Sequence, residues 1–235
     1  MKMVAALPIY MNYAASVDDP VERLKCVMVA NISYIYCDKI FEKPLDPMIG
    51  ETYQMFAEDG ARVFVEQTSA DPPRQHFMID GPDDRYSVTG HMCHAISTNG
   101  YSATARPAGH KEFKFHDGQT IRASLIGDCV FPLMWGTLIH QLIGKIEFKD
   151  EANNLHGYYQ ISGYTAQTQD YIYGEIFRGE ERICEINANY MGFFDFDKVR
   201  YWDIREKNKT WLNGYVNDPD SLQSDSVRRK DARAL

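Results

Sequence analysis

From Thr52 to about Ile204 the chain is a succession of short segments in which apolar and polar residues alternate. Alternation with a period of two is typical of β-strands that bury one face. Asp117-Gly118 and Asn153-Asn154 lie between such segments and are strong hairpin signals. The predicted strands are 62–66, 76–79, 86–89, 101–105, 112–116, 120–125, 145–149, 158–162, 171–173, 175–177, 183–186 and 199–204. Short strands with little helix between them predict a mainly β fold, an antiparallel β-barrel that is incomplete, strongly curved or closed.

One helix is expected before these strands. Asp19 suits the N-cap, Pro20 the first turn, and Glu22 the third helical position of a capping box. Apolar residues then recur at helical spacing and predict a helix that runs to about Tyr36, after an N-terminal arm at 1–19.

Length and composition favour one domain over residues 1–235, with a polar C-terminal tail at 217–235. The net charge of −8 argues against nucleic-acid partners. No apolar run approaches the roughly 20 residues that span a bilayer, and the start is a poor signal peptide. The five cysteines are odd in number and widely spaced, which fits reduced thiols. We therefore expect an intracellular, cytoplasmic protein.

Two motifs carry a family resemblance. Residues 43–53 read Lys-Pro-Leu-Asp-Pro-Met-Ile-Gly-Glu-Thr-Tyr, and residues 66–73 read Glu-Gln-Thr-Ser-Ala-Asp-Pro-Pro. They resemble the signature of the ligand-binding domain of the oxysterol-binding protein family, whose usual forms are Lys-Pro-Leu/Phe-Asn-Pro-x-x-Gly-Glu and Glu-Gln-x-Ser-His-His-Pro-Pro. The matching signature positions are Lys43, Pro44, Asp46, Pro47, Gly50, Glu51, Glu66, Gln67, Ser69, Pro72 and Pro73.

The resemblance implies a carrier that encloses a lipid in an apolar tunnel. It also implies that Lys43 corresponds to the family's phosphate-contacting lysine. Ile49, Phe64 and Phe77 lie near the motifs and are candidate tunnel walls, although apolar residues in strands are more often ordinary core.

The phosphate-binding part of the signature departs from the family pattern. Asp46 stands at the family asparagine, and Ala70-Asp71 replace the two histidines. A carboxylate only accepts hydrogen bonds and repels phosphate, so we expect no phosphoinositide exchange. The six residues before Leu7 are fewer than the family's lid uses, and its C-terminal helix has no counterpart here.

Two functions remain open at this point. The first is a carrier of a sterol or similar single lipid, with sterol or phospholipid as its ligand and peripheral contact with membranes. The second is a structural subunit of a larger assembly that has lost lipid transfer and binds proteins through the barrel mouth and residues 217–235. The sequence has no hydrolase, nucleotide or zinc-protease motif, and His91-Met-Cys-His94 has no second ligand pair. We therefore expect no enzyme activity, no cofactor and no metal.

Overall fold

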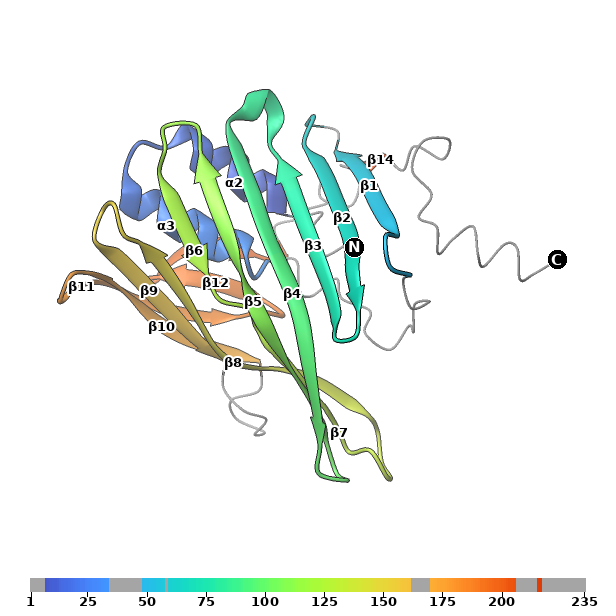
Figure 1. Ribbon diagram of the computed structural model, residues 1–235. Helices are drawn as coiled ribbons and strands as arrows, with labels where there is room; N and C mark the ends of the chain where they lie inside the picture. The colour runs from blue at the N-terminus through green and yellow to red at the C-terminus, as the bar shows by residue number, and fades with distance from the viewer. Residues whose placement is uncertain (1–6, 34–47, 58, 162–169, 206–214, 217–235) are drawn as a thin grey trace.

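The computed structural model describes residues 7–33, 48–57, 59–161, 170–205 and 215–216 (Figure 1). Two helices come first, α2 (Leu7–Ser16) and α3 (Pro20–Ala30). The strands that follow are β1 (Thr52–Ala57), β2 (Arg62–Ala70), β3 (Pro73–Asp80), β4 (Tyr86–Thr98), β5 (Ala103–Phe115), β6 (Thr120–Ala123), β7 (Gly127–Phe131), β8 (Ile139–Asp150), β9 (Leu155–Ile161), β10 (Tyr171–Arg178), β11 (Glu181–Asn189), β12 (Phe193–Phe196), β13 (Val199–Asp203) and β14 (Tyr215–Val216). A short 3-10 turn, Pro82–Asp84, joins β3 to β4.

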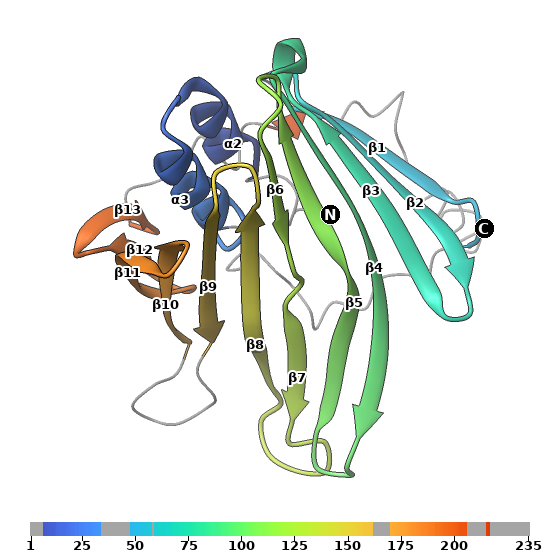
Figure 2. The ribbon, with the colours of Figure 1, turned by 60° about the vertical axis from the view of Figure 1, so that its left-hand side comes forward.

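All the strands belong to one antiparallel sheet whose order nearly follows the sequence, from β13 at one edge through β1 to β14 at the other. The sheet curves strongly, and Figure 2 shows the helices lying inside the curve. In the part of the chain that the structure describes, β13 and β14 are not paired with each other. The prediction of a mainly β antiparallel barrel is confirmed, and of the two forms that it left open, incomplete or closed, the described strands adopt the incomplete one.

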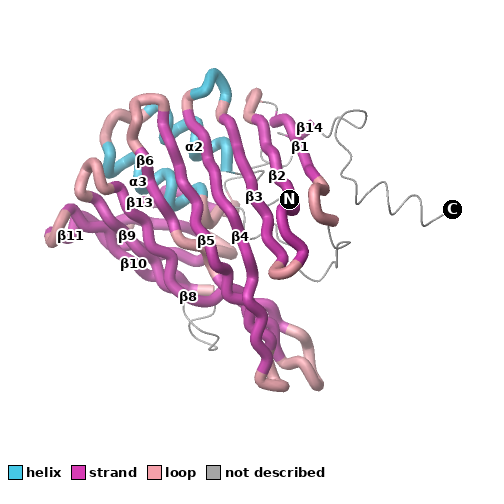
Figure 3. The backbone as a smooth tube through the Cα atoms, viewed as in Figure 1, coloured by secondary structure: helices cyan, strands magenta, loops and turns pink. Residues whose placement is uncertain are grey.

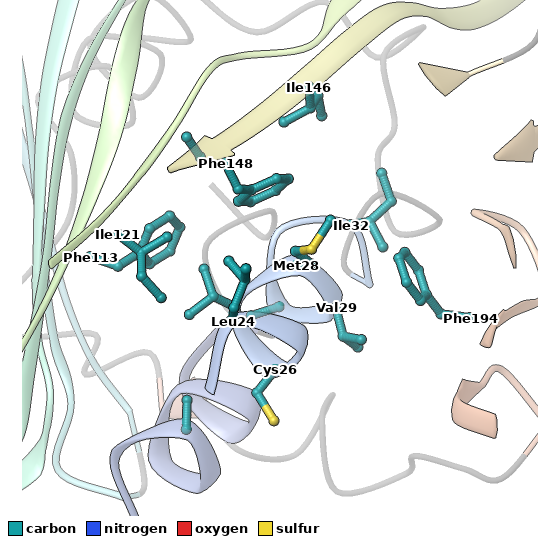
Figure 4. Packing of buried hydrophobic residues seen from close by; sticks show 14 of the residues in the cluster. Leu24, Cys26, Met28, Val29, Ile32, Phe113, Ile121, Ile146, Phe148 and Phe194 are labelled. Atoms are coloured by element: carbon teal, nitrogen blue, oxygen red, sulfur yellow. The ribbon is translucent and has the colours of Figure 1, made fainter. Parts of the chain in front are cut away.

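Helix α3 fills one end of the curved sheet. Leu24, Met28 and Ile32 are completely buried and face strand residues such as Phe113 and Phe194 (Figure 4). Asp19 caps the helix, because its carboxylate accepts a hydrogen bond from the backbone N–H of Val21. Close packing of this kind is what makes core residues costly to truncate.

A buried arginine joins the helices to the sheet. Arg23 on α3 is 1% exposed and donates hydrogen bonds to the backbone oxygens of Ala14 and Val17 at the end of α2. It also pairs with the carboxylate of Asp117 and the side chain of Gln119, in the β5–β6 turn. A buried charge is tolerated only when paired and hydrogen-bonded, and these four partners supply that.

Four details differ from the sequence prediction. The helix ends at Ala30 with Asn31 as its C-cap, so it stops short of the predicted end, and residues 34–36 lie outside the described part of the chain. Helix α2 occupies part of the predicted arm. Glu22, which was predicted to complete a capping box, instead accepts a hydrogen bond from the hydroxyl of Tyr201, 2.8 Å away, and forms an ion pair with Lys25.

The fourth difference is that two predicted strands, 101–105 and 112–116, form the single strand β5. The segment between the two predicted strands contains Pro107 and Gly109. In the structure β6 pairs with β5 only from Lys111 onward, and β7 only up to Ala105, so the residues between pair with β4 alone. A proline is tolerated there because no second neighbouring strand needs its missing N–H.

The two ends of the sheet are unlike. We call the end covered by α2 and α3 the helix end. At the opposite end, which we call the hairpin end, the β4–β5 turn (residues 99–102) and the β7–β8 connection (132–138) extend beyond the other strands (Figure 3). The β2–β3 turn points in the same direction as these two hairpins (Figures 1 and 2).

Candidate functional site

The two signature motifs meet at the start of β1. The backbone N–H of Gly50 donates to the carbonyl of Gln67 at 2.8 Å, and the N–H of Gln67 donates to the carbonyl of Glu51 at 3.0 Å. The side chain of Glu51 accepts from the N–H of Met48 and so fixes the turn that precedes the strand. Gly50 has a φ of +77°, a conformation that glycine adopts without strain. Lys43, Pro44, Asp46 and Pro47 lie outside the described residues.

A row of apolar side chains crosses the inner face of the sheet beside these motifs. Tyr53, Val65, Phe77 and Gly90 are partners in register on four successive strands. The first three are partly buried and pack against the core. A Cβ at Gly90 would lie 2.5 Å from the Phe77 ring, so the ring rests directly on the glycine backbone. We call Tyr53, Val65, Phe77, Gly90 and their next partner Lys111 the inner row.

Lys111 ends the inner row with a positive charge. Its Nζ donates to Oδ1 of Asn31 at 2.7 Å, and Nδ2 of Asn31 donates to the Tyr159 hydroxyl at 3.0 Å. Asn31 and Tyr159 are buried. The chain of contacts runs from β5 across the C-terminal end of α3 to β9, and it borders the helix-filled core.

A polar row lies one step nearer the hairpin end. Glu51 and Gln67 are buried, and Gln67 is in register with the half-buried Gln75 on β3. The amide nitrogen of Gln67 donates to the carbonyl of Ser69. Its amide oxygen is buried without a hydrogen-bond partner among the described residues. Leaving a buried acceptor unpaired costs free energy, so this oxygen is suited to an incoming donor.

The three candidate wall residues are placed differently. Phe77 lies in the inner row. Phe64 precedes Val65 in the same strand, so its side chain points to the opposite face of the sheet. Ile49 is 66% exposed in the turn before β1. The structure therefore does not bring these three residues together.

The remaining positions of the second motif form the end of β2 and the β2–β3 turn. Glu66 is exposed, Ser69 is half-buried, and Pro72 and Pro73 are exposed. Ala70 and Asp71 are also exposed there, and the peptide bond from Asp71 to Pro72 is cis.

Histidines gather on the outer face of the sheet. The His91 ring lies 5.4 Å from that of His76 and 5.1 Å from that of His110, on three adjacent strands. Desolvation, together with the neighbouring His110 and His76 and with Arg74, lowers the pKa of His91 below its ordinary value. Within the described ranges no group of three or more histidine, cysteine, aspartate or glutamate side chains is arranged to hold a metal ion.

In addition to the polar row, a pair of polar side chains lies on the inner face nearer the hairpin end. His140 on β8 is 2.8 Å from the carboxylate of Asp128 on β7, and both are half-buried. Nearby, Tyr190 donates its hydroxyl hydrogen to Asp170. Burial first, and then this carboxylate, raise the pKa of Tyr190 well above its ordinary value.

Sequence reasoning missed Lys111, Asn31, Tyr53 and Gln75. A signal for Lys111 was present, because it has the same strand parity as Phe113 and Phe115, both of which are buried. Asn31 gave no such signal, since it follows a helix whose end was predicted too late.

An open, curved antiparallel sheet wrapped around a buried helix, with apolar side chains lining its inner face, defines the class of the fold. The family model for oxysterol-binding protein matches residues 7–233, and the chain belongs to the oxysterol-binding protein family. Oxysterol-binding protein 9 of Dictyostelium discoideum is 28% identical over 97% of this chain and 59% of its own length. The human oxysterol-binding protein-related protein 1 is 34% identical over 41% of this chain and 10% of its own length. The chain thus matches less than two thirds of the length of each of these relatives.

Solved structures show the same fold. The Osh1 ORD domain in complex with ergosterol superposes with a TM-score of 0.79 at 16% identity, over 94% of this chain and 61% of that one. The Osh3 ORD of Saccharomyces cerevisiae in complex with PI(4)P gives a TM-score of 0.73 at 16% identity, over 86% of this chain and 57% of that one. Among the described residues, no helix is both long and apolar enough to cross a bilayer.

Proposed function

We propose that this protein binds a single lipid, a sterol or a lipid of similar shape, against the inner row, and carries it without exchanging it for a phosphoinositide. The observation that carries the proposal is the inner row itself, in which Tyr53, Val65 and Phe77 face the inside of the curved sheet next to the signature motifs. Membership of the oxysterol-binding protein family supports it. Solved structures of the same fold are described with ergosterol, cholesterol or PI(4)P bound.

The chemistry of binding follows from the two neighbouring rows. The apolar body of the lipid would cover the inner row, and each Å² of apolar surface removed from water stabilises the complex by about 25 cal/mol. A single hydroxyl, as on a sterol, would donate to the unpartnered amide oxygen of Gln67. Binding and release require no covalent step, so the proposed activity is not enzymatic.

The proposal excludes phosphoinositide exchange because of the β2–β3 turn. Phosphate binding needs cations or N–H donors that converge on its oxygens. Ala70 offers no side-chain donor, and the Asp71 carboxylate, which is exposed at this turn, repels an anion. Specific binding of phosphatidylinositol 4-phosphate to the pure protein would overturn this part of the proposal.

The experiment is native mass spectrometry after incubation with ergosterol or cholesterol, and it compares two substitutions at adjacent residues. Val65→Trp places a bulky ring in the inner row and is expected to abolish the sterol-bound species. Phe64→Trp is the matched control, because it changes the opposite face of the same strand, and it is expected to bind as the wild type does. Circular dichroism and thermal unfolding confirm that both variants are folded. Equal sterol binding by folded Val65→Trp and wild type would refute the inner row as the site.

The second candidate is the structural subunit that has lost lipid transfer. Replacement of the family histidine pair by Ala70-Asp71 favours it, since this change removes donors without adding new ones. It predicts an empty chain in a large complex when the protein is isolated from its own cells without detergent. A free 27.0 kDa chain carrying one lipid would exclude it.

A further inference from the structure

Two chain reversals lie side by side at the hairpin end. β7 pairs with β5 in three residue pairs, the outermost of which joins Ala103 on β5 to Val130 on β7. This pairing brings the β7–β8 connection against the β4–β5 turn. The backbone N–H of Leu133 donates to the carbonyl of Tyr101 at 2.8 Å, and the rings of Tyr101 and Phe131 stack with their centroids 6.4 Å apart. The two reversals therefore form one projecting unit (Figures 1 and 2).

The projecting unit is apolar and uncharged. Residues 95–105 and 129–139 contain no Asp, Glu, Lys or Arg, although these make up 25% of the chain. Trp135 is 77% exposed and Ile96 is 76% exposed, in a position where an ordinary protein surface would be polar. We call the exposed side chains of this unit the apolar tip: Ile96, Tyr101, Leu133, Met134, Trp135 and Leu138. Exposed apolar groups gathered in this way mark a surface that contacts something other than water.

The backbone N–H groups of the β4–β5 turn donate hydrogen bonds to acceptors within the same turn. The side-chain oxygen of Asn99 accepts hydrogen bonds from the N–H groups of Tyr101 and Ser102, and from the Ser102 hydroxyl. The N–H of Gly100 donates to the hydroxyl of Thr98, and the N–H of Asn99 donates to the carbonyl of Ser102. A turn that enters a lipid environment has to pair its polar backbone groups in this way, because lipid offers them few partners.

We propose that the apolar tip inserts into the interfacial region of a phospholipid bilayer. Tryptophan and tyrosine are the residues enriched at this boundary, where the ring is apolar and its N–H or O–H stays hydrated. A stable protein partner needs a broad face of roughly 800 Å², whereas the apolar tip consists of two narrow reversals at the end of a sheet. The inference deepens the proposed function, because a lipid carrier has to reach a membrane, and the β2–β3 turn beside the inner row points the same way (Figure 1).

The charge of the protein decides which kind of membrane contact this is. The net charge of −8 disfavours anionic lipids, and Arg106, whose guanidinium donates to the Ser97 hydroxyl, is a single cation at the border of the unit. Binding then rests on apolar burial. It should occur on neutral phosphatidylcholine vesicles, should not be strengthened by phosphatidylserine, and should persist in 0.5 M NaCl, a concentration at which charge interactions are screened beyond about 5 Å.

The test is co-sedimentation of the whole protein with phosphatidylcholine vesicles, together with quenching of tryptophan fluorescence by bromine-labelled lipid. Trp135→Ser is expected to lower the partition coefficient at least tenfold, equivalent to about 1.4 kcal/mol, and to remove most of the quenching. Trp202 is 2% exposed and so contributes little to quenching, and Trp211, which lies outside the described residues, is replaced by phenylalanine in every protein compared. Tyr173→Ser is the matched control, because Tyr173 is an exposed aromatic residue on β10, and it should partition as the wild type does.

Each outcome decides the question. Equal partitioning of folded Trp135→Ser and wild type, or no binding of the wild type, overturns the proposal. So does a change in oligomeric state for Trp135→Ser with vesicle binding unchanged, since the apolar tip would then be a protein interface. Sterol supplied from cyclodextrin separates this inference from the proposed function. If Trp135→Ser loads sterol from cyclodextrin but not from vesicles, both stand. If the wild type binds vesicles but never loads sterol, only the proposed function fails.

Discussion

The helix end and the hairpin end of the same sheet are built from similar strands but differ in what covers them. At the helix end the inward residues are covered by α3, and Leu24, Phe113 and Phe194 are completely buried. At the hairpin end Trp135 and Ile96 are largely exposed, and the nearby inward residues include His140 and Asp128, which are half-buried and 2.8 Å apart. We therefore expect the helix end to contribute most of the stability of the fold, and we place the proposed membrane contact at the hairpin end.

The largest expected effect is the difference in the free energy of unfolding between a substitution at the helix end and one at the hairpin end. Leu24→Ala removes a fully buried side chain and leaves a cavity, so it should lower the free energy of unfolding by about 2–5 kcal/mol. Trp135→Ser should change it by less than about 0.5 kcal/mol, because an exposed side chain loses little packing. Urea denaturation followed by circular dichroism measures both. Similar losses for the two variants would show that the apolar tip is part of the folding core.

An intermediate effect is expected at the junction of helices and sheet. Arg23→Met keeps a long apolar stem but removes the guanidinium that binds Ala14, Val17, Asp117 and Gln119. Because the buried carbonyl of Ala14 and the side chain of Gln119 then lose their donor, the free energy of unfolding should fall by about 1–3 kcal/mol. Vesicle partitioning should be unchanged. A loss of vesicle binding at full stability would mean that the two ends are coupled.

The smallest effect is the part of the pH dependence of stability that Cys26 contributes at the helix end. Burial raises the pKa of the Cys26 thiol to about 12, and Glu22 acts in the same direction. The folded protein thus holds this proton more tightly than the unfolded chain, so the stability contributed is complete at neutral pH and declines as the pH rises from about 9 toward 12. The decline for one thiol is at most about 1.4 kcal/mol per pH unit.

Cysteine substitutions isolate that effect. Cys26→Ala should flatten the fall of stability between pH 9 and pH 10.5 relative to the wild type. Cys129→Ala, at the hairpin end, is the matched control for the loss of a thiol. Parallel pH profiles for wild type and Cys26→Ala would contradict the expectation.

The fold was largely predictable because strand alternation and turn residues act locally. The turns at Asp117-Gly118 and Asn153-Asn154 were identified correctly, and so was the N-cap at Asp19. The fusion of 101–105 with 112–116 into β5 was not predictable, since it depends on which strands leave Pro107 without a second neighbour. That information lies in the pairing of strands remote in sequence.

The candidate site was less predictable for the same reason. In β2 the residues Val63, Phe64 and Val65 are all apolar, so alternation does not show which face each one occupies. Val63 is buried in the structure, so Val63 and Val65 face the inside of the sheet and Phe64, between them, faces outward. The apolar tip was hidden because Tyr101 was assigned to a strand, whereas it lies in a turn. The cytoplasmic location and the roles of Lys43 and residues 217–235 stay predictions.

The position of α3 early in the chain has a consequence for synthesis. Its partner Tyr201 lies 179 residues after Glu22, and at typical rates of translation that interval takes roughly 10–35 s. During that time the sheet around Leu24, Met28 and Ile32 is incomplete, because Phe113 is made long before Phe194 and Tyr201. The helix is therefore fully enclosed only after the last strands of the sheet have been made.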